Sequence, residues 1–193
     1  MMLHLIRHGE TRATGHLLGR TDPEPTPAGV TAVRDQLRQC DAELAIASPL
    51  RRARAAFGDA AAIDEDWAEI DFGDWDGQRL KSLNETTGGR FGQFLEDPEA
   101  VTPPNGESWP QFRLRIARGI ETLLDTNVES AAVVTHAGAI RTAIHIVCGA
   151  PFRATWAMRI DYATAVSLNV DRDERRRIWG ELVSMRQPPA DLR

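Results

Sequence analysis

The sequence predicts an α/β fold: a three-layer α/β/α sandwich whose central sheet is mostly parallel and carries helices on both faces. Short apolar runs that suit buried strands alternate along the chain with segments whose apolar residues recur at helical spacing. With 193 residues, 42% of them hydrophobic and 26% charged, the chain has the size and composition of one globular domain. We therefore treat residues 1–193 as a single domain.

The first half of the chain predicts two strand–helix pairs. A short apolar run at residues 2–6 is typical of a buried parallel strand. Apolar residues at helical spacing then predict a helix over residues 27–40, which Thr26 would cap. The strand pattern returns at residues 44–47, and the Ala- and Arg-rich composition of residues 50–62 predicts a second helix.

The second half continues this alternation. An apolar stripe predicts a long helix over residues 108–124, followed by a buried strand at residues 131–135 and a helix at residues 139–147. Residues 165–170 and 177–182 are interpreted as a late pair of strands. In such folds the ligand crevice lies beyond the carboxyl ends of the strands, which shows where to look for a site.

Charge and composition argue against several classes of protein. The formal net charge of −5 is not typical of a protein that binds nucleic acid, which usually has an excess of positive charge. No apolar run is long enough to cross a membrane, and the N-terminus lacks the basic flank of a targeting segment. The two cysteines, Cys40 and Cys148, form no C-x-x-C motif and are expected to be free thiols. We expect a cytoplasmic protein.

Polar residues stand where three of the predicted strands end. Arg7 and His8 follow the first strand, Arg51 and Arg52 lie shortly after the second, and His136 follows the third. Because the carboxyl ends of parallel strands meet at one edge of the sheet, we expect these side chains to converge. Arginine forks match the oxygens of a phosphate group. A small phosphate monoester is therefore the predicted ligand and the expected partner.

A histidine in such a pocket can do more than bind. A neutral imidazole nitrogen in line with phosphorus can attack it and form a phosphohistidine, which water then hydrolyses. The sequence contains no Walker loop, EF-hand or His-x-x-x-His pair, so we expect neither a metal nor another cofactor. The arginines would stabilise the charge of the transition state instead.

The segment Leu5-Ile6-Arg7-His8-Gly9-Glu10-Thr11 resembles the signature of the histidine phosphatase superfamily, which includes the phosphoglycerate mutases. Further blocks follow in the family's order: Gly19-Arg20-Thr21-Asp22, Ser48-Pro49-Leu50-Arg51-Arg52-Ala53, Glu69-Ile70-Asp71-Phe72-Gly73-Asp74-Trp75-Asp76-Gly77, Gly106-Glu107-Ser108 and Val133-Val134-Thr135-His136-Ala137-Gly138. The resemblance therefore extends over nearly the whole chain and implies a phosphoglycerate mutase-like fold.

The resemblance also implies a role for each central residue. His8 would be the phosphorylated nucleophile, Arg7 and Arg52 would clamp the phosphoryl group, and His136 would stabilise it from the opposite side. Glu69 occupies the family's proton-donor position. A carboxyl beside a phosphate dianion can have its pKa raised, which suits it to protonate an alkoxide leaving group. Asp71, two residues along, is a competitor for this role or could share it.

Three further residues are expected to support the substrate. Gly19 and Ala137 would approach it through their backbone, and Glu107 would orient an arginine through a charge-assisted hydrogen bond. His16 lies in the loop after the signature, near the expected entrance for substrate, and its role is left open.

The substrate must come from the variable wall of the pocket, which we predict at residues 78–107. The chain is short and little of it follows the last strand pair, which favours a phosphatase over phosphoglycerate mutase-type phosphoryl transfer. It looks most like the compact alpha-ribazole phosphatases. A phosphate-binding or protein-binding module without turnover is the alternative from another class. Because dimers are common in the superfamily, the resemblance also admits a homodimer.

Overall fold

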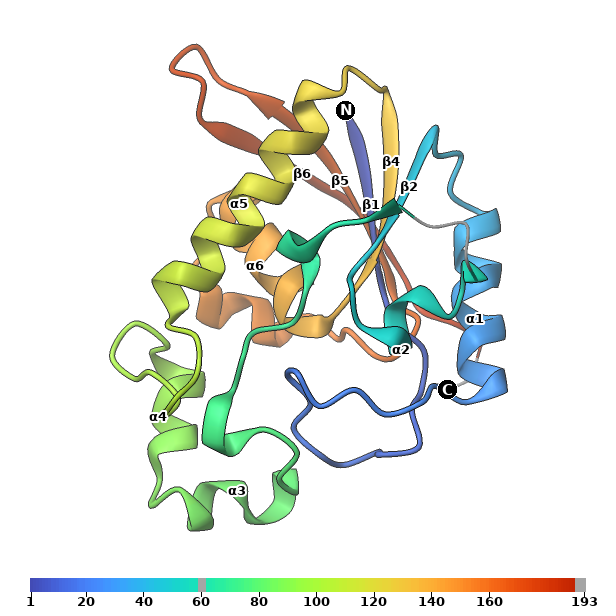
Figure 1. Ribbon diagram of the computed structural model, residues 1–193. Helices are drawn as coiled ribbons and strands as arrows, with labels where there is room; N and C mark the ends of the chain where they lie inside the picture. The colour runs from blue at the N-terminus through green and yellow to red at the C-terminus, as the bar shows by residue number, and fades with distance from the viewer. Residues whose placement is uncertain (59–61, 190–193) are drawn as a thin grey trace.

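The computed structural model describes residues 1–58 and 62–189, and its centre is a six-stranded sheet in the order β3-β2-β4-β1-β5-β6 (Figure 1). The strands are β1 (Met2–Arg7), β2 (Leu44–Ala47), β3 (Ala62–Ile63), β4 (Ser130–Thr135), β5 (Ala165–Arg172) and β6 (Ile178–Arg186). Strands β1 to β4 pair in parallel, whereas β5 and β6 pair antiparallel. The predicted mostly parallel sheet is confirmed.

Helices cover both faces of this sheet. The helices of the described chain are α1 (Pro27–Arg38), α2 (Arg51–Arg54), α3 (Leu80–Thr86), α4 (Arg90–Glu96), α5 (Trp109–Asp125) and α6 (Ala137–Cys148), with short 3-10 turns η2 (Glu65–Trp67), η3 (Gly73–Trp75) and η4 (Phe152–Ala157). Helices α5 and α6 lie on one side of the strands, and α1 and α2 lie on the other (Figure 1). Within the described residues no helix is both long and apolar enough to span a membrane.

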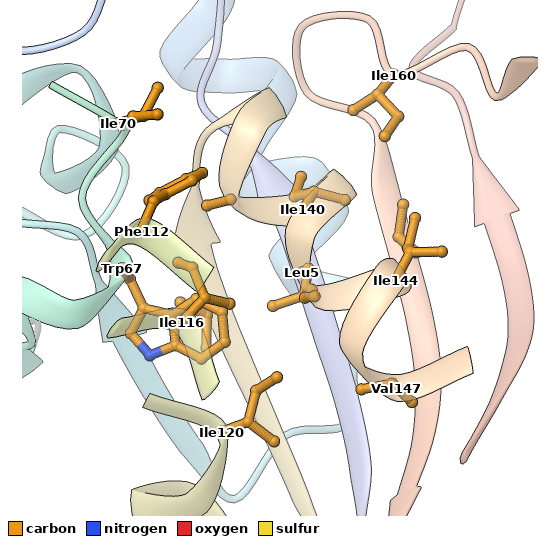
Figure 2. Packing of buried hydrophobic residues seen from close by; sticks show 14 of the residues in the cluster. Leu5, Trp67, Ile70, Phe112, Ile116, Ile120, Ile140, Ile144, Val147 and Ile160 are labelled. Atoms are coloured by element: carbon orange, nitrogen blue, oxygen red, sulfur yellow. The ribbon is translucent and has the colours of Figure 1, made fainter. Parts of the chain in front are cut away.

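The alternation of side chains along β1 divides the core between the two faces. Leu5 is buried with the apolar residues of α5 and α6, and Figure 2 shows it close to Ile140 and Ile144 of α6. Its neighbour Ile6 points the other way and belongs to a smaller cluster with Val33 of α1. Burial on both faces holds β1 firmly in place, and β1 is the strand that delivers Arg7 and His8 to the sheet edge.

Side-chain caps fix where two of the helices begin. The hydroxyl of Thr26 accepts a hydrogen bond from Gly29 N–H at the start of α1. At α5, Ser108 and Gln111 form a capping box in which each side chain bonds to the other residue's backbone N–H. Both helix starts agree with the sequence analysis.

The helix predicted over residues 50–62 is wrong beyond its first turn. Helix α2 spans only Arg51–Arg54, and Ala62 belongs to strand β3, while residues 59–61 lie outside the described part of the chain. Gly58 adopts a left-handed φ of +65°, which no helix continues. Helical propensity is a weak preference, and here the parallel pairing of β3 with β2 overrides it.

The segment predicted to face the substrate, residues 78–107, contains α3 and α4, which Figure 1 shows at the end of the molecule towards which β1 runs. The ring of Phe94 on α4 packs edge-on against Phe72 and Trp75. Gly73 packs against the backbone at Pro104, near the end of this segment, and has a φ of +49°. A methyl group on Gly73 would come within 2.1 Å of the Pro104 carbonyl oxygen. Only glycine allows this close approach.

Candidate active site

The predicted catalytic residues meet beyond the carboxyl ends of β1, β2 and β4. In the parallel register Arg7 of β1 lies opposite Thr135 of β4, so His8 and His136 follow directly on adjacent strands. The backbone N–H of His8 donates to the Thr135 carbonyl at 2.8 Å, which continues the ladder by one residue. Ser48, which follows β2, joins the group from the other side of β4.

His8 is buried and held in one tautomer. Its Nδ1 lies 2.8 Å from the carbonyl oxygen of Gly9. Because a carbonyl can only accept, Nδ1 carries the hydrogen and Nε2 keeps its lone pair. Burial, and then the charges of Arg7 and Arg52, hold the pKa of His8 well below its ordinary value. The imidazole is therefore neutral at physiological pH, with a nucleophilic Nε2.

His136 faces His8 from the end of β4, with 5.2 Å between the two ring centres. Its Nε2 lies 2.6 Å from Ser48 Oγ. The same Oγ accepts the backbone N–H of Leu50 at 3.4 Å. When the Ser48 hydroxyl donates its hydrogen to Nε2, Nδ1 of His136 carries the ring hydrogen and is a donor. Burial, and then the charge of Arg52, keep the pKa of His136 well below its ordinary value.

Arg52 is fully buried and fixed by backbone carbonyls of one loop. Its Nη1 donates to Thr21 O at 2.8 Å and to the Asp22 carboxylate at 3.2 Å. Its Nη2 donates to Gly19 O at 2.7 Å and to Leu18 O at 3.2 Å. The planar guanidinium therefore has one orientation, which a lysine could not reproduce.

The neighbouring arginines play different parts. Arg51 is exposed and pairs with Glu24 at 2.6 Å, so its charge is used at the surface. Arg7 donates through Nη1 to the Ile160 carbonyl at 2.8 Å, and its guanidinium carbon lies 4.1 Å from the ring centre of Tyr162. The ring of Tyr162 thus makes a cation–π contact that helps to hold the Arg7 guanidinium in place.

Three buried polar atoms around His8 make no hydrogen bond to any described residue: Nε of Arg7, Nε of Arg52 and Nδ1 of His136. Buried polar atoms without partners are rare in folded proteins because each one is costly. These donors come from three separate elements and surround one nucleophile. An anion with several acceptor oxygens, such as a phosphate group, would complement them.

Glu69 reaches the same site, whereas Asp71 does not. Glu69 is only 7% exposed, and its two oxygens accept the backbone N–H groups of Ile70 and Gly138, both at 3.0 Å. Burial raises its pKa above the ordinary value despite these hydrogen bonds. Asp71 instead accepts the N–H of Gly73 at 2.8 Å within its own turn. The carboxyl at the cavity is therefore that of Glu69.

Glu107 acts on Glu69 from a distance. Its carboxylate binds Arg115 with both oxygens, at 2.9 and 2.8 Å. Arg115 in turn donates to the carbonyls of Asp66, Ala68 and Glu69. The expected bond between Glu107 and an arginine is present, but the carboxylate binds Arg115 and the backbone N–H of Asp71 and does not line the cavity. This geometry makes Glu107 a positioning residue; its direct contact with substrate stays a prediction.

Gly19 is required by packing. A methyl group at this position would lie 2.6 Å from the Ile70 carbonyl oxygen. Its N–H donates to Asp76 at 2.8 Å, and Asp76 also accepts the N–H groups of Arg20 and Thr21. The polar backbone groups of Gly19 are thus used within the protein, and its contact with substrate remains a prediction.

Sequence reasoning missed the two positioning residues Asp76 and Arg115. Both act through backbone groups of loops, and no spacing in the sequence shows which loop a side chain will reach. Ala137 begins α6 and lines the cavity, and its backbone contact with substrate stays a prediction.

Next to His8 lies a cavity of about 340 Å³. Arg7, His8 and Glu69 form its polar end, and His16 also lines it. The rest of the wall is mainly apolar and aromatic: Leu17, Leu18, Ile70, Phe72, Leu80, Phe91, Phe94, Leu95, Trp109, Phe112, Ala137, Gly138, Arg141, Phe152, Trp156, Ile160 and Tyr162. In the described part of the chain, no three His, Cys, Asp or Glu side chains group in a way that could hold a metal ion.

A family model described as the histidine phosphatase superfamily (branch 1) matches residues 3–179. The chain belongs to this superfamily. The resemblance inferred from the sequence motifs is therefore confirmed, and with it the class of enzyme, a phosphatase.

Curated relatives of this histidine phosphatase are named for different substrates. It is 28% identical over 184 residues to adenosylcobalamin/alpha-ribazole phosphatase of Escherichia coli strain K12, with 88% of this chain and 91% of the relative covered. It is 23% identical to a Hydrogenobacter thermophilus protein named for phosphoserine phosphatase activity, with 89% and 91% covered. Among solved structures, the alpha-ribazole phosphatase of Shigella flexneri has 25% identity, 97% and 96% coverage and a TM-score of 0.78.

The contact between Gly138 and Glu69 predicts the effect of one added methyl group. In Gly138→Ala the new carbon would lie 2.2 Å from Oε1 of Glu69, so the carboxyl must move. Alanine is the better helix former by about 1 kcal/mol, which offsets the crowding. We expect the melting temperature to be kept and kcat to fall by about a hundredfold, since misplacement by about 1 Å has this effect. An unchanged kcat would show that this carboxyl position is not needed.

Proposed function

We propose that this chain hydrolyses a small phosphate monoester without a metal, through a phosphohistidine formed on His8. The observation that carries the proposal is the neutral His8 ring, whose Nδ1–H is tied to Gly9 O, so that Nε2 keeps its lone pair beside the charges of Arg7 and Arg52. Arg7, Arg52 and His136 supply hydrogen-bond donors from three different elements.

The first step forms the phosphoenzyme. The lone pair of His8 Nε2 attacks phosphorus, and the bond from phosphorus to the ester oxygen breaks. The departing oxygen takes a proton from Glu69, whose raised pKa keeps a protonated fraction available. The guanidinium groups of Arg7 and Arg52 stabilise the charge on the transferring group, a role that a metal ion fills in other phosphatases.

The second step returns the enzyme to its starting state. Glu69, now a carboxylate, accepts a proton from a water molecule whose oxygen attacks the phosphohistidine. The bond from phosphorus to nitrogen breaks, phosphate leaves, and His8 regains its neutral form. One carboxyl thus serves first as acid and then as base, so each cycle restores its proton.

Alpha-ribazole phosphate is the specific substrate that the relatives suggest. The proteins from Escherichia coli and Shigella flexneri named for this activity match nearly the full length of the chain. A relative named for phosphoserine phosphatase activity matches over a similar length. The polar end of the cavity serves any phosphate monoester, so the choice between substrates depends on the apolar walls.

We also propose a cytoplasmic location. Cys40 and Cys148 are both free thiols. Free cysteines are typical of proteins from reducing compartments.

The direct test is hydrolysis of p-nitrophenyl phosphate with EDTA present, comparing the wild type with His8→Ala. We expect activity in the wild type, no effect of the chelator, and no detectable turnover in the variant, since Nε2 forms the phosphoenzyme. Loss of activity in EDTA that added metal restores would contradict the metal-free mechanism. Transfer to phosphoglycerate without hydrolysis would favour a mutase. Tight vanadate binding with no turnover of any phosphoester would favour a binding module.

The role of Glu69 predicts a dependence on the leaving group. An alkyl phosphate needs a proton on its departing alkoxide, whereas p-nitrophenolate leaves without one. In Glu69→Gln we therefore expect formation of the phosphoenzyme to slow on the order of 10²-fold for glycerol 3-phosphate and far less for p-nitrophenyl phosphate. Single-turnover measurements give both rates, and Asp71→Asn is the matched control. Equal losses for the two substrates would remove Glu69 from the role of acid.

A further inference from the structure

Aromatic side chains form much of the wall of the cavity beside the phosphate site. Phe91 and Phe94 line it from α4, Trp109 from α5, and Phe152 and Trp156 from η4. The rings of Trp109 and Phe152 are in contact, with 4.1 Å between their centres. Walls of this kind select a ligand by its apolar area and flatness.

The mouth of the cavity is apolar as well. Leu80 of α3 and Trp156 of η4 both line the cavity, and they are 45% and 46% exposed. Exposed apolar side chains that border a cavity indicate a surface that a ligand covers. A small polar alcohol such as glycerol would leave both of them in water.

One cation interrupts these apolar walls. Arg141 lies on α6 one turn after Ala137, lines the cavity and is only 8% exposed. Its Nη1 donates to the carbonyls of Thr155 and Met158, and its guanidinium carbon lies 4.4 Å from the ring centre of Trp156. The hydrogen bonds that Arg141 makes within the described part of the chain use Nη1 alone.

Arg141 makes no ion pair with any carboxylate within the described part of the chain. Arg7 and Glu69 are nevertheless near enough to influence its pKa. Burial lowers the pKa of Arg141 to about 10, so the side chain stays protonated at neutral pH. A buried cation without an anionic partner is costly, and an anionic oxygen on a ligand would offset that cost.

We propose that the natural substrate is a phosphate monoester of an alcohol that carries an aromatic ring with a carboxylate. The ring packs between the walls from α4, α5 and η4, and Arg141 binds the carboxylate as a specificity-determining residue. This inference rests on the proposed phosphatase function and narrows it. Alpha-ribazole phosphate carries a ring but no carboxylate, so the inference departs from the substrate for which several relatives are named.

The test compares kcat/KM for glycerol 3-phosphate, benzyl phosphate, and 3- and 4-carboxybenzyl phosphate. All of these release alkoxides, so differences in rate report the pocket rather than the chemistry of the leaving group. We expect benzyl phosphate to exceed glycerol 3-phosphate by about tenfold, through burial of the ring. The better carboxybenzyl ester should exceed benzyl phosphate by about another tenfold, through the charge-assisted bond to Arg141.

Variants separate the two contributions. In Arg141→Gln the ratio of kcat/KM for carboxybenzyl to benzyl phosphate should fall to about one, whatever happens to absolute activity, and Arg141→Lys should restore part of it. A folding defect would lower kcat/KM for both substrates by the same factor and leave their ratio unchanged. In Leu80→Asp the ratio of benzyl to glycerol phosphate should fall. Leu114→Asp is the matched control, because Leu114 is 68% exposed on α5 and does not line the cavity.

Two results would overturn the inference while leaving the proposed function intact. One is His8-dependent hydrolysis of glycerol 3-phosphate as efficient as that of benzyl phosphate. The other is a carboxybenzyl preference that is absent or that survives in Arg141→Gln. Failure to hydrolyse any phosphate ester, p-nitrophenyl phosphate included, would instead contradict the phosphatase function itself.

Discussion

The hydrogen bond from His8 Nδ1 to the Gly9 carbonyl, 2.8 Å long, is the interaction on which the site depends. It fixes the tautomer and the direction of the ring, and the other donors are arranged around the nitrogen that it leaves free. The Gly9 backbone is itself held tightly, since a methyl group there would lie 2.1 Å from the Gly29 carbonyl oxygen. Helix α1 therefore supports the nucleophile although none of its side chains lines the cavity.

Burial of the two histidines and of Glu69 accounts for the protonation states that the chemistry needs. The same burial that lowers the pKa of His8 and His136 raises the pKa of Glu69, so the nucleophile is neutral and the acid can hold a proton. Two hydrogen-bond networks maintain this arrangement. In the first, Arg52 donates to backbone carbonyls of a loop whose backbone N–H groups donate to the Asp76 carboxylate. Arg115, fixed by Glu107, binds the segment that ends in Glu69.

Much of this site was predictable because its central residues directly follow strands. Apolar runs locate the strands, and parallel pairing then brings their ends together, as it does for His8 and His136. The extent of the helix after Arg51 was not predictable, because strand pairing beyond it decides where the helix ends. Arg115 and Arg141 also escaped, since each resembles a solvated arginine of an amphipathic helix until the carbonyls and rings that it meets are known.

The central claim is that a phosphoryl group passes through His8, and trapping that intermediate tests it most directly. Glu69→Gln mixed with p-nitrophenyl phosphate should form the phosphoenzyme readily and hydrolyse it slowly, because the water-activating carboxylate is missing. After quenching in alkali, in which phosphohistidine is stable, the account predicts a single phosphoryl group on the peptide that carries His8. Rapid product release with an unmodified His8, or a phosphoryl group on another residue, would contradict it.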